Sequence, residues 1–437
     1  ERAAASRERS SLGGRRCGGS LGCSNRQSER PQAASAQAWA VAAAAAPVDR
    51  QIKPCGAGRT TPGADPANAG VDDDPVATTD AHCASVVFRY IRIMSADAVL
   101  DPTEPVLPDA KMHVVMPNAP VAAKIHGTRL CMKGKSASYI RHVEIDISGT
   151  PLEGSFRAGQ SFGVIPSGTD ANGKPHKVRL YSLASPSWGE DGFGRVIATT
   201  PKRVIAEREP QRPADDPADH SLFLGVCSNW LCDRKTGDAV DVSGPNGKRF
   251  LLPEDPSKHD YVFLATGTGI APFRGFLMEL LVGPPAGSPA AATWKRCESR
   301  IELVMGSPYT TDLLYDDFLR DLAAKHPNFR YHPVISREIR ADGAGGFAKG
   351  EYVHHFMHRM LDRQTGVMDL LHSPRTLMYM CGLAGMQLGV FELLARHGIG
   401  GFTKVADELA GKPVPEWTAD DIKRRVRPTH RCMLEVY

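Results

Sequence analysis

A glycine-rich segment with the spacing of a phosphate-binding turn spans residues 266–274, which read T-G-T-G-I-A-P-F-R. Gly267 and Gly269, on either side of Thr268, would let the backbone approach a pyrophosphate closely, and Pro272 can open a following helix. The free N–H groups of that helix would then face the phosphate. The segment departs from G-x-G-x-x-G because proline stands in place of the third glycine. Its position after an apolar run favours a dinucleotide-binding turn over a purely structural one.

Two further segments carry residue types suited to a flavin nucleotide. Residues 179–182 read R-L-Y-S: an arginine could neutralise a diphosphate, a tyrosine could lie against a ring and a serine could hydrogen-bond a flavin edge. Taken alone, this tetrapeptide is explained more simply by a surface strand with alternating polar residues. Residues 225–232 read G-V-C-S-N-W-L-C. A glycine followed by small residues at a helix start would supply backbone donors to a second phosphate group.

Metal-binding patterns are weak in this sequence. The ten cysteines are scattered from Cys17 to Cys432 and form no C-x-x-C pair, which argues against an iron–sulfur or zinc site. His354 and His358 stand four residues apart and could clamp a metal on one helix face. No third ligand or catalytic glutamate accompanies them in H-E-x-x-H form, so an exposed helix with several histidines is favoured. We predict no metal site.

The composition is that of a globular protein with an unusual beginning. The 437 residues, 42% of them hydrophobic and 23% charged, can hold two domains of ordinary size and an extension. A net charge of +4 does not indicate nucleic acid, and no apolar run is long enough to predict an integral membrane segment. Residues 1–50 are rich in Ala, Ser and Arg, which is typical of an organelle transit peptide or of a disordered tail. We predict that 1–112 is a largely disordered N-terminal extension.

The middle of the chain has the pattern of β-structure. Tyr139, Val143, Ile145 and Ile147 fall on one alternating face, as expected of a half-buried strand. Further strand-like runs at 178–184, 196–200 and 239–242 are separated by turns rich in Gly, Pro and Asn. Short strands at this spacing predict a small antiparallel barrel, which we place at residues 113–254.

Beyond Pro253 short apolar runs alternate with helix-period stretches such as 273–281 and 315–324. Alternation of strands and helices predicts a parallel sheet with helices on both faces over residues 255–437. Ligands of such sheets bind at the carboxyl ends of the strands, where turns bearing Gly or Ser are found here. The runs expected to form strands are 261–265, 301–305, 331–335 and 377–380.

The phosphate- and flavin-type segments, in this order and spacing, resemble the plant-type ferredoxin–NADP(+) reductase family. The resemblance extends over roughly residues 119–437. It implies a β + α/β fold, with an N-terminal antiparallel FAD-binding barrel and a C-terminal parallel-sheet NADP-binding domain. The other matching stretches are 159–166 (G-Q-S-F-G-V-I-P), 172–185 (N-G-K-P-H-K-V-R-L-Y-S-L-A-S), 379–386 (Y-M-C-G-L-A-G-M) and the terminal 435–437 (E-V-Y).

By this likeness Tyr181 stacks on one face of the flavin and Tyr437 on the other. Two aromatic rings around a flavin exclude water, and a terminal residue can move aside cheaply to admit nicotinamide. Arg179 and the backbone of 225–228 would hold the diphosphate. The residues implied in FAD binding are Arg179, Tyr181, Ser182, Lys202, Gly225, Val226, Cys227, Ser228 and Tyr437.

The same likeness implies that Ser182, Cys381 and Glu435 carry hydride transfer. Ser182 would hydrogen-bond flavin N5, Cys381 would position nicotinamide C4, and Glu435 would orient the pair and pass protons. Taken singly, Cys381 is a small buried residue at a strand end and Glu435 is a solvated tail carboxylate. Their assignment comes from the matching motifs.

NADP rather than NAD is expected. Ser336 and Arg337 stand where the family places a Ser–Arg pair against the adenosine 2′-phosphate, which a planar guanidinium suits. Tyr352 matches the tyrosine that stacks on adenine. The family has Lys or Arg two residues before that tyrosine, but this chain has Gly350 there and Lys349 one place earlier. We expect the long side chain of Lys349 to reach the phosphate.

The resulting prediction is a flavoenzyme that exchanges hydride with NADP(H) and single electrons with an iron–sulfur protein such as ferredoxin. An acidic carrier, ferredoxin or a flavodoxin-like protein, would meet a basic rim on the barrel. The basic residues of that region are Lys133, Lys135, Arg141, Lys174, Lys177, Lys202 and Arg203.

Two alternatives stay open at this point. One is the reductase component of a multicomponent oxygenase, and the other is a flavin-loaded redox sensor that does not turn over. A bacterial cytoplasmic location is favoured, with a plastid as the alternative if the N-terminal extension is a transit peptide.

Overall fold

The computed structural model describes residues 104–208, 215–341, 346–362 and 369–437. The predicted N-terminal extension therefore lies outside the described residues, apart from 104–112. The backbone of Val106 accepts a 2.9 Å hydrogen bond from the Glu254 N–H, and that of Lys111 accepts one of 3.0 Å from Gln160 Nε2. No helix within the described ranges is long and apolar enough to cross a membrane.

The first half of the described chain forms a six-stranded antiparallel sheet in the order β4-β3-β8-β1-β2-β5. Its two outer strands meet: the Ala184 N–H donates to the Ala198 carbonyl at 2.7 Å, and Thr199 Oγ1 donates to the Ser182 carbonyl at 2.8 Å. These bonds close the sheet into a barrel, as predicted. Its strands are β1 (Val121–Leu130), β2 (Arg141–Asp146), β3 (Ser161–Ile165), β4 (Arg179–Ser182), β5 (Val196–Thr199) and β8 (Ala239–Asn246).

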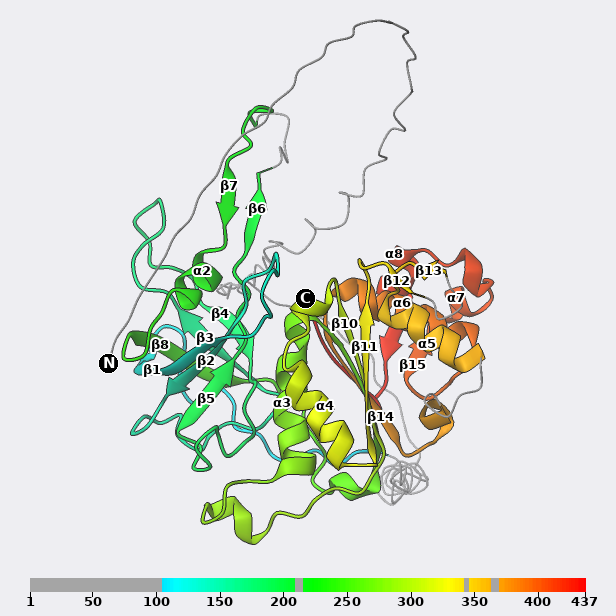
Figure 1. The fold of residues 1–437 in the computed structure, drawn as a ribbon, viewed down its shortest axis with the longest axis horizontal. Helices are drawn as coiled ribbons and strands as arrows, with labels where there is room; N and C mark the ends of the chain where they lie inside the picture. Colours follow the sequence, from blue (N-terminus) through cyan, green and yellow to red (C-terminus); the bar gives the residue numbers. More distant parts are fainter. Residues whose placement is uncertain (1–103, 209–214, 342–345, 363–368) are drawn as a thin grey trace, which may run out of the picture. The chain divides into compact units, whose positions relative to one another are not determined.

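The barrel is filled by the alternating side chains that the sequence pattern singled out. Val143, Ile145 and Ile147 are fully buried and pack with Phe162 of β3 and Leu231 of the helix α2 (Val226–Cys232). The hairpin of β6 (Ile205–Glu207) and β7 (Leu222–Leu224) precedes α2 and extends away from the barrel (Figure 1).

The second half contains a parallel five-stranded sheet in the order β11-β10-β9-β14-β17, which confirms the predicted fold class. The four expected strands are present, and a fifth is formed by the last residues of the chain. The strands are β9 (Asp260–Thr266), β10 (Ile301–Ser307), β11 (Phe329–Ile335), β14 (Thr376–Gly382) and β17 (Cys432–Val436).

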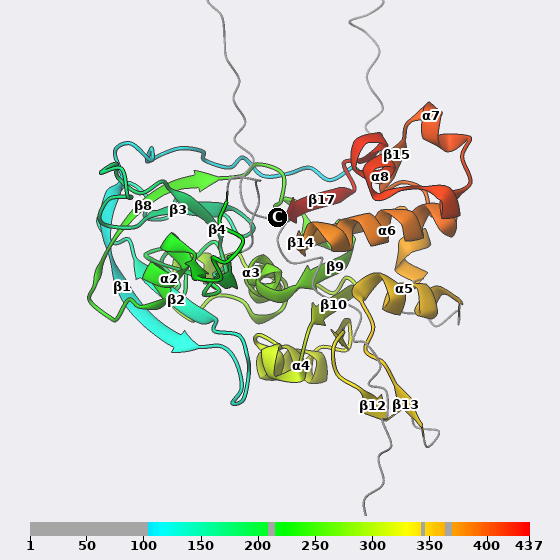
Figure 2. The same cartoon turned by 90° about the horizontal axis from the view of Figure 1, so that it is seen from above.

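Helices cover both faces of this sheet (Figures 1 and 2). Tyr261 and Phe263 of β9 point into the core under α3 and α4, whereas Val262 and Leu264 point into the core under α5 and α6. Both faces are therefore apolar, as expected of a buried parallel strand. The helices are α3 (Ala271–Leu277), α4 (Asp316–Lys325), α5 (Val353–Asp362) and α6 (Ala384–Arg396).

The smaller elements connect or flank these layers. A 3₁₀ turn, η2 (Gly267–Ile270), leads into α3, and a π-helical turn, η3 (Met278–Val282), continues it. The others are η1 (Pro256–Lys258), η4 (Pro289–Ala292), η5 (Thr310–Asp312), β12 (Arg340–Ala341), β13 (Phe347–Ala348), η6 (Asp369–His372), β15 (Thr403–Val405), α7 (Asp407–Ala410), η7 (Val414–Glu416), α8 (Ala419–Arg425) and β16 (Val426–Pro428).

One apolar core lies between barrel and sheet and is formed by residues of both. Phe250, at the end of the barrel segment, stacks on Phe276 of α3 with ring centroids 5.7 Å apart and meets Tyr379 of β14 edge-on. The Tyr379 hydroxyl donates to the Leu251 carbonyl at 2.7 Å. A Cβ at Gly159 of the barrel would lie 2.7 Å from a ring carbon of Phe276 on α3, so the two halves approach too closely for any side chain there. This close packing sets the position of the barrel residues relative to the strand ends of the sheet.

Candidate active site

Two of the three predicted catalytic residues are brought together by strand pairing. Cys381 near the end of β14 is in register with Glu435 on β17. Ser182 comes from the end of β4 in the barrel, and its Oγ donates to Glu435 Oε2 at 3.3 Å. Figures 1 and 2 both show the C terminus between β4 and the parallel sheet. Residues 253 positions apart in the sequence thus form one hydrogen-bonded pair.

The protonation states at this place follow from burial. Burial raises the pKa of Glu435 to about 7, while the hydrogen bond from Ser182 opposes the shift. Burial, aided by the nearby Glu435 charge, raises the pKa of the Cys381 thiol well above its usual range. The thiol is therefore protonated at neutral pH and is no nucleophile. Glu435 is the one group of the three that can gain or lose a proton near pH 7.

Tyr437 is held by its backbone and leaves its ring largely free. Its N–H donates to the Gly382 carbonyl at 2.9 Å, and its own carbonyl accepts from the Ala384 N–H at 3.1 Å. The side chain is 54% exposed, and its hydroxyl shares a 2.7 Å hydrogen bond with Thr268 Oγ1. An exposed aromatic ring anchored at its base can turn aside without disturbing the core.

The glycine-rich turn η2 has two different reasons for its glycines. Gly267 has a φ of +55° with no atom near its missing Cβ, so a side chain there would meet strain but no neighbour. A Cβ at Gly269 would lie 2.1 Å from the Cys381 carbonyl oxygen. Gly269 is therefore required by packing against β14, whatever the turn binds. Thr266 completes the junction by accepting the Leu383 N–H at 2.8 Å through its Oγ1.

The start of α2 offers donors to an anion. Gly225 precedes the helix in an extended conformation, no side chain caps its first turn, and no acidic residue lies in that turn. The backbone donors there are those of Val226, Cys227 and Ser228, while the Cys227 thiol points to the Val164 carbonyl at 3.8 Å inside the barrel. An uncapped, acid-free first turn suits a phosphate.

Two of the predicted FAD-binding side chains on β4 lie beside this helix. Tyr181 packs against the barrel core. Burial raises the pKa of the Cys227 thiol, while a hydrogen bond with Tyr181 and the charge of Arg179 both lower it, so the two β4 side chains lie close to this thiol. Arg179 is exposed. Lys202 is also exposed, with its backbone bridging Ile140. An exposed cation, a tyrosine and an uncapped helix start at one place fit the diphosphate and ring system of FAD.

Ser336 and Arg337 follow β11, at the sheet edge opposite β17. Both are tied by their backbones to the next strand end: the Ser336 N–H donates to Ser307 and the Arg337 N–H to Pro308, each at 3.0 Å. The side chain of Arg337 is exposed. A fixed backbone with an exposed guanidinium can receive a phosphate from solvent.

The structure explains the departure at Gly350. A Cβ there would lie 2.5 Å from the Ile335 carbonyl oxygen and from the Ser336 carbonyl carbon. Residue 350 therefore packs directly on the backbone that carries the Ser–Arg pair, and a lysine has no room. Lys349 is exposed one place earlier, and Tyr352 is 60% exposed with its ring nearly parallel to that of His354, at an angle of 6°.

The sequence motifs gave no role to Arg274 and Glu190, which join the two halves. Arg274 of α3 donates to both carboxylate oxygens of Glu190 and, at 2.9 Å, to the Ala184 carbonyl of the barrel. Both side chains are nearly buried, at 11% and 14% exposure, so this bidentate pair fixes α3 and the turn before it against the barrel. Arg274 ends the glycine-rich motif, and that position was the only signal.

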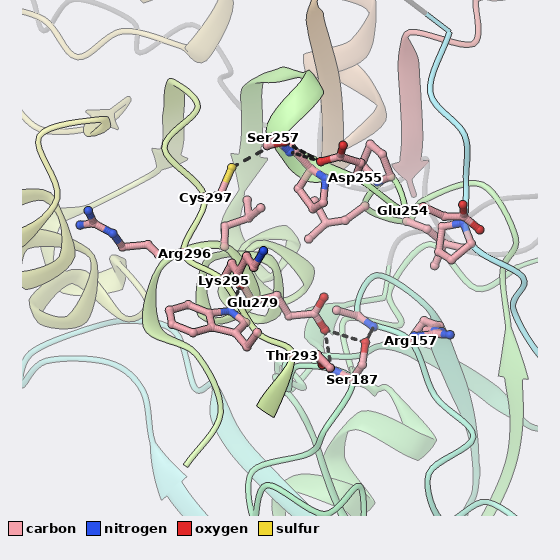
Figure 3. A pocket seen from close by; sticks show the side chains of 18 of the residues that line it. Arg157, Ser187, Glu254, Asp255, Ser257, Glu279, Thr293, Lys295, Arg296 and Cys297 are labelled. Atoms are coloured by element: carbon pink, nitrogen blue, oxygen red, sulfur yellow. Dashed lines mark hydrogen bonds between the residues drawn. The ribbon is translucent and has the colours of Figure 1, made fainter. Parts of the chain in front are cut away.

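A pocket of about 570 Å³ opens elsewhere, beside the barrel–sheet linker. Figure 3 shows Ser187 and Glu279 pointing toward one another there, and the Ser187 hydroxyl donates to Glu279 Oε1 at 2.6 Å. None of the predicted site residues lines this pocket. The candidate active site lies instead at the carboxyl ends of the parallel strands.

Comparisons with known proteins agree with this geometry. The family described as "Oxidoreductase NAD-binding domain" matches residues 263–391. The chain is 33% identical to a ferredoxin–NADP reductase of Synechocystis over 338 residues, which cover 77% of this chain and 72% of that protein. It is 34% identical to the chloroplastic leaf isozyme 1 of the same enzyme from Arabidopsis thaliana, with 66% and 70% covered.

Solved structures show the same fold. The ferredoxin–NADP(+) reductase of Plasmodium falciparum, solved with 2′P-AMP, superposes with a TM-score of 0.51 and 21% identity, covering 75% of this chain and all of the other. Fold, strand-end geometry and the identity over more than two thirds of the relatives' length agree. This chain belongs to the ferredoxin–NADP reductase family.

Proposed function

We propose that this protein is a ferredoxin–NADP(+) reductase in which Ser182, Cys381 and Glu435 form the site of hydride transfer. The observation that carries the assignment is the 3.3 Å hydrogen bond from Ser182 to Glu435. It joins the barrel to the strand paired with Cys381. The relatives, which are named ferredoxin–NADP reductases, favour neither an oxygenase reductase component nor a redox sensor without turnover.

The chain uses FAD, which supplies the conversion between hydride transfer and single-electron transfer when bound. The proposed binding residues are the backbone of 225–228, the exposed cations Arg179 and Lys202, and the rings of Tyr181 and Tyr437. Tyr437 covers its side of the site in the absence of nicotinamide. To let nicotinamide in, its ring turns aside, which breaks a single side-chain hydrogen bond, the one to Thr268. The barrel domain is proposed to extend over 113–254 and the nucleotide-binding domain over 255–437.

The proposed proton route begins at Glu435. Forming NADPH from NADP(+) requires two electrons and one proton, and the two single-electron deliveries bring no proton with them. Glu435, whose pKa burial raises to about 7, holds a proton in hydrogen-bonding contact with Ser182. Cys381 stays protonated and neutral, so its part is to position the nicotinamide by shape and contact.

NADP selectivity is proposed to come from the opposite edge of the sheet. Ser336 and Arg337 would bind the 2′-phosphate, with Lys349 adding charge and Tyr352 stacking on the adenine. Gly267, Thr268 and Gly269 would lie along the pyrophosphate between the two ends. Along the sheet, β11 comes first, then β9, then β14. The proposed contacts at these strand ends are to the 2′-phosphate, the pyrophosphate and the nicotinamide, and these parts follow one another in the same order in the dinucleotide.

The electron carrier is proposed to dock on exposed lysines of the barrel. Of the basic residues there, Lys133 is paired with Asp317 at 3.0 Å and Arg203 with Asp233. Lys174 and Lys177 are exposed on the connection leading into β4, which carries Tyr181 and Ser182. They are the better candidates for attracting an acidic ferredoxin or a flavodoxin-like carrier.

The test is stopped-flow reduction of the FAD-loaded protein with NADPH and with NADH, followed by a ferredoxin-coupled cytochrome assay. We expect reduction by NADPH to be the faster and the coupled rate to fall with rising salt. Equal rates with both nucleotides would refute the NADP assignment, and no reduction of the carrier would refute the ferredoxin assignment. Lys177→Glu should weaken carrier reduction without changing reduction by NADPH.

A cytoplasmic location is proposed, with a plastid as the alternative outcome of the test. Residues 1–112 fused to a fluorescent protein would report it: import of the fusion into isolated chloroplasts would overturn the cytoplasmic assignment.

A further inference from the structure

Two histidines from different helices face each other outside the candidate active site. His358 Nδ1 on α5 lies 2.6 Å from Nε2 of His397, the residue that caps the carboxyl end of α6. Their ring planes are inclined by 72° with centroids 4.7 Å apart. Each ring therefore directs a nitrogen into the same small space.

An acidic side chain completes the cluster. Asp362 Oδ2 lies 3.7 Å from His358 Nδ1, and the three ligand atoms of His358, Asp362 and His397 all lie within 4.8 Å of one another. His358 and Asp362 stand four residues apart and so share one face of α5. Two imidazoles and a carboxylate from two packed helices are a ligand set that zinc accepts.

The pair that the sequence suggested is a different one. His354 packs over Gly389 of α6, where an added Cβ would lie 2.6 Å from its ring, and it faces the rings of Tyr352 and His355. Its partner in the sequence pattern, His358, turns to His397 instead. The missing third ligand comes from a residue 39 positions away, beyond the reach of a local motif.

We propose that His358, Asp362 and His397 bind one divalent zinc ion, with water completing a tetrahedral shell. This departs from the prediction of no metal site. The side chains of His358 and Asp362 are 41% and 59% exposed, so they have room to move. The two ring nitrogens, 2.6 Å apart, must separate to roughly 3.3 Å to share one tetrahedral zinc ion at the usual Zn–N distance. The ion would clamp the carboxyl end of α5 to that of α6. Since α5 starts directly after Tyr352, the clamp would also steady the helix behind the proposed adenine contact.

The primary test is a zinc titration of the full-length, FAD-loaded protein against a chromogenic chelator. We expect the wild type to bind one equivalent that His358→Ala and His397→Ala lose or bind at least about tenfold more weakly. Asp362→Asn, which keeps the side-chain shape, should weaken binding without disturbing the fold, as checked by retained FAD absorbance. His355→Ala is the matched control, because it removes a neighbouring exposed histidine of the same helix and should bind like the wild type.

Cobalt(II) distinguishes this site from the chain's cysteines. A His₂Asp site should give the visible bands of tetrahedral cobalt without a thiolate charge-transfer band, and His397→Ala should abolish them. Zinc should also raise the thermal midpoint of the wild type but not that of His397→Ala. Equal zinc binding by the wild type, His358→Ala and His397→Ala would overturn the proposal, as would no binding at all.

Discussion

The two ends of the candidate nucleotide site are built in different ways. At the chemistry end, made by the ends of β4, β14 and β17, Cys381 is fully buried and Glu435 is hydrogen-bonded to Ser182 across the two halves. At the recognition end, made by the end of β11 and residues 349–352, the side chains of Arg337, Lys349 and Tyr352 are exposed. Strand pairing sets geometry at the first end, whereas the second end displays charge on a fixed backbone.

The two ends differ because their tasks need different kinds of precision. Hydride transfer depends on near-contact alignment of two rings, which only a close-packed frame provides. Phosphate recognition depends on charge and on hydrogen-bond donors that can adapt. Substitutions at the chemistry end should therefore lower kcat or stability, and substitutions at the recognition end should raise KM.

The largest effect is expected at the chemistry end. Glu435→Ala and Ser182→Ala should each lower kcat for NADPH oxidation by about 100-fold, with little change in KM, because they remove positioning and proton transfer. Steady-state kinetics with ferricyanide as acceptor measure this. Glu408→Ala, which removes an exposed carboxylate on α7, should behave like the wild type. Unchanged NADPH oxidation in both variants would contradict the catalytic assignment.

Packing at the same end gives the next largest effect. Gly269→Ala places a Cβ only 2.1 Å from the Cys381 carbonyl oxygen. This overlap should lower the free energy of unfolding by about 2 kcal/mol. Urea denaturation followed by fluorescence measures the change. In Gly385→Ala the added Cβ meets nothing within 4 Å on a helix, so that variant should be unchanged or more stable. Equal stability of the two variants would show that the turn is looser than its contacts indicate.

A smaller effect is expected at the recognition end. Arg337→Ala should raise KM for NADPH by about tenfold, because one charge-assisted contact to the 2′-phosphate is lost, and should leave KM for NADH and kcat nearly unchanged. Arg424→Ala, on the exposed face of α8, is the control. An equal rise for both nucleotides would place Arg337 outside the 2′-phosphate site.

The rate of NADP(+) reduction should change a few-fold with pH, and this pH dependence should come from the chemistry end alone. Because burial raises the pKa of Glu435 to about 7, the carboxyl is protonated below and ionised above that value. Reduction of NADP(+) consumes a proton, so its rate should fall as pH rises through 7, and Glu435→Gln should remove this inflection. The same shift also affects the free energy of unfolding. The stabilising contribution of Glu435 is fully present below the ordinary pKa of its carboxyl, 4.5, and is lost as the pH rises through about 7. Rates measured across this range in constant ionic strength provide the test, and an inflection retained in Glu435→Gln would assign it to another group.

The smallest effect is expected from Lys349→Ala, with a two- to threefold rise in KM for NADPH, about the size of one exposed charge contact. Its side chain is exposed and one place out of register with the family pattern. A change as large as that of Arg337→Ala would mean that Lys349 binds the phosphate directly.

The fold was predictable because both halves carry strong local signals. The alternation of Val143, Ile145 and Ile147 marked a barrel strand, and the runs 261–265 and 377–380 marked buried parallel strands. The last strand, β17, was missed because it is short, lies at the chain end and has no partner nearby in the sequence. Its pairing with β14 is non-local, and no local pattern carries that information.

The fold class, the order of the nucleotide-binding segments and the family could be predicted from the sequence, because each depends on residue types at fixed local spacing. Three contacts became visible only in the folded chain: Ser182 meets Glu435, Gly269 touches the backbone of Cys381, and His358 turns to His397 rather than to His354. The titration of Glu435 near neutral pH was decided in the same way. These features depend on contacts and burial created when distant segments pack together, and such packing is a property of the whole chain rather than of any motif within it.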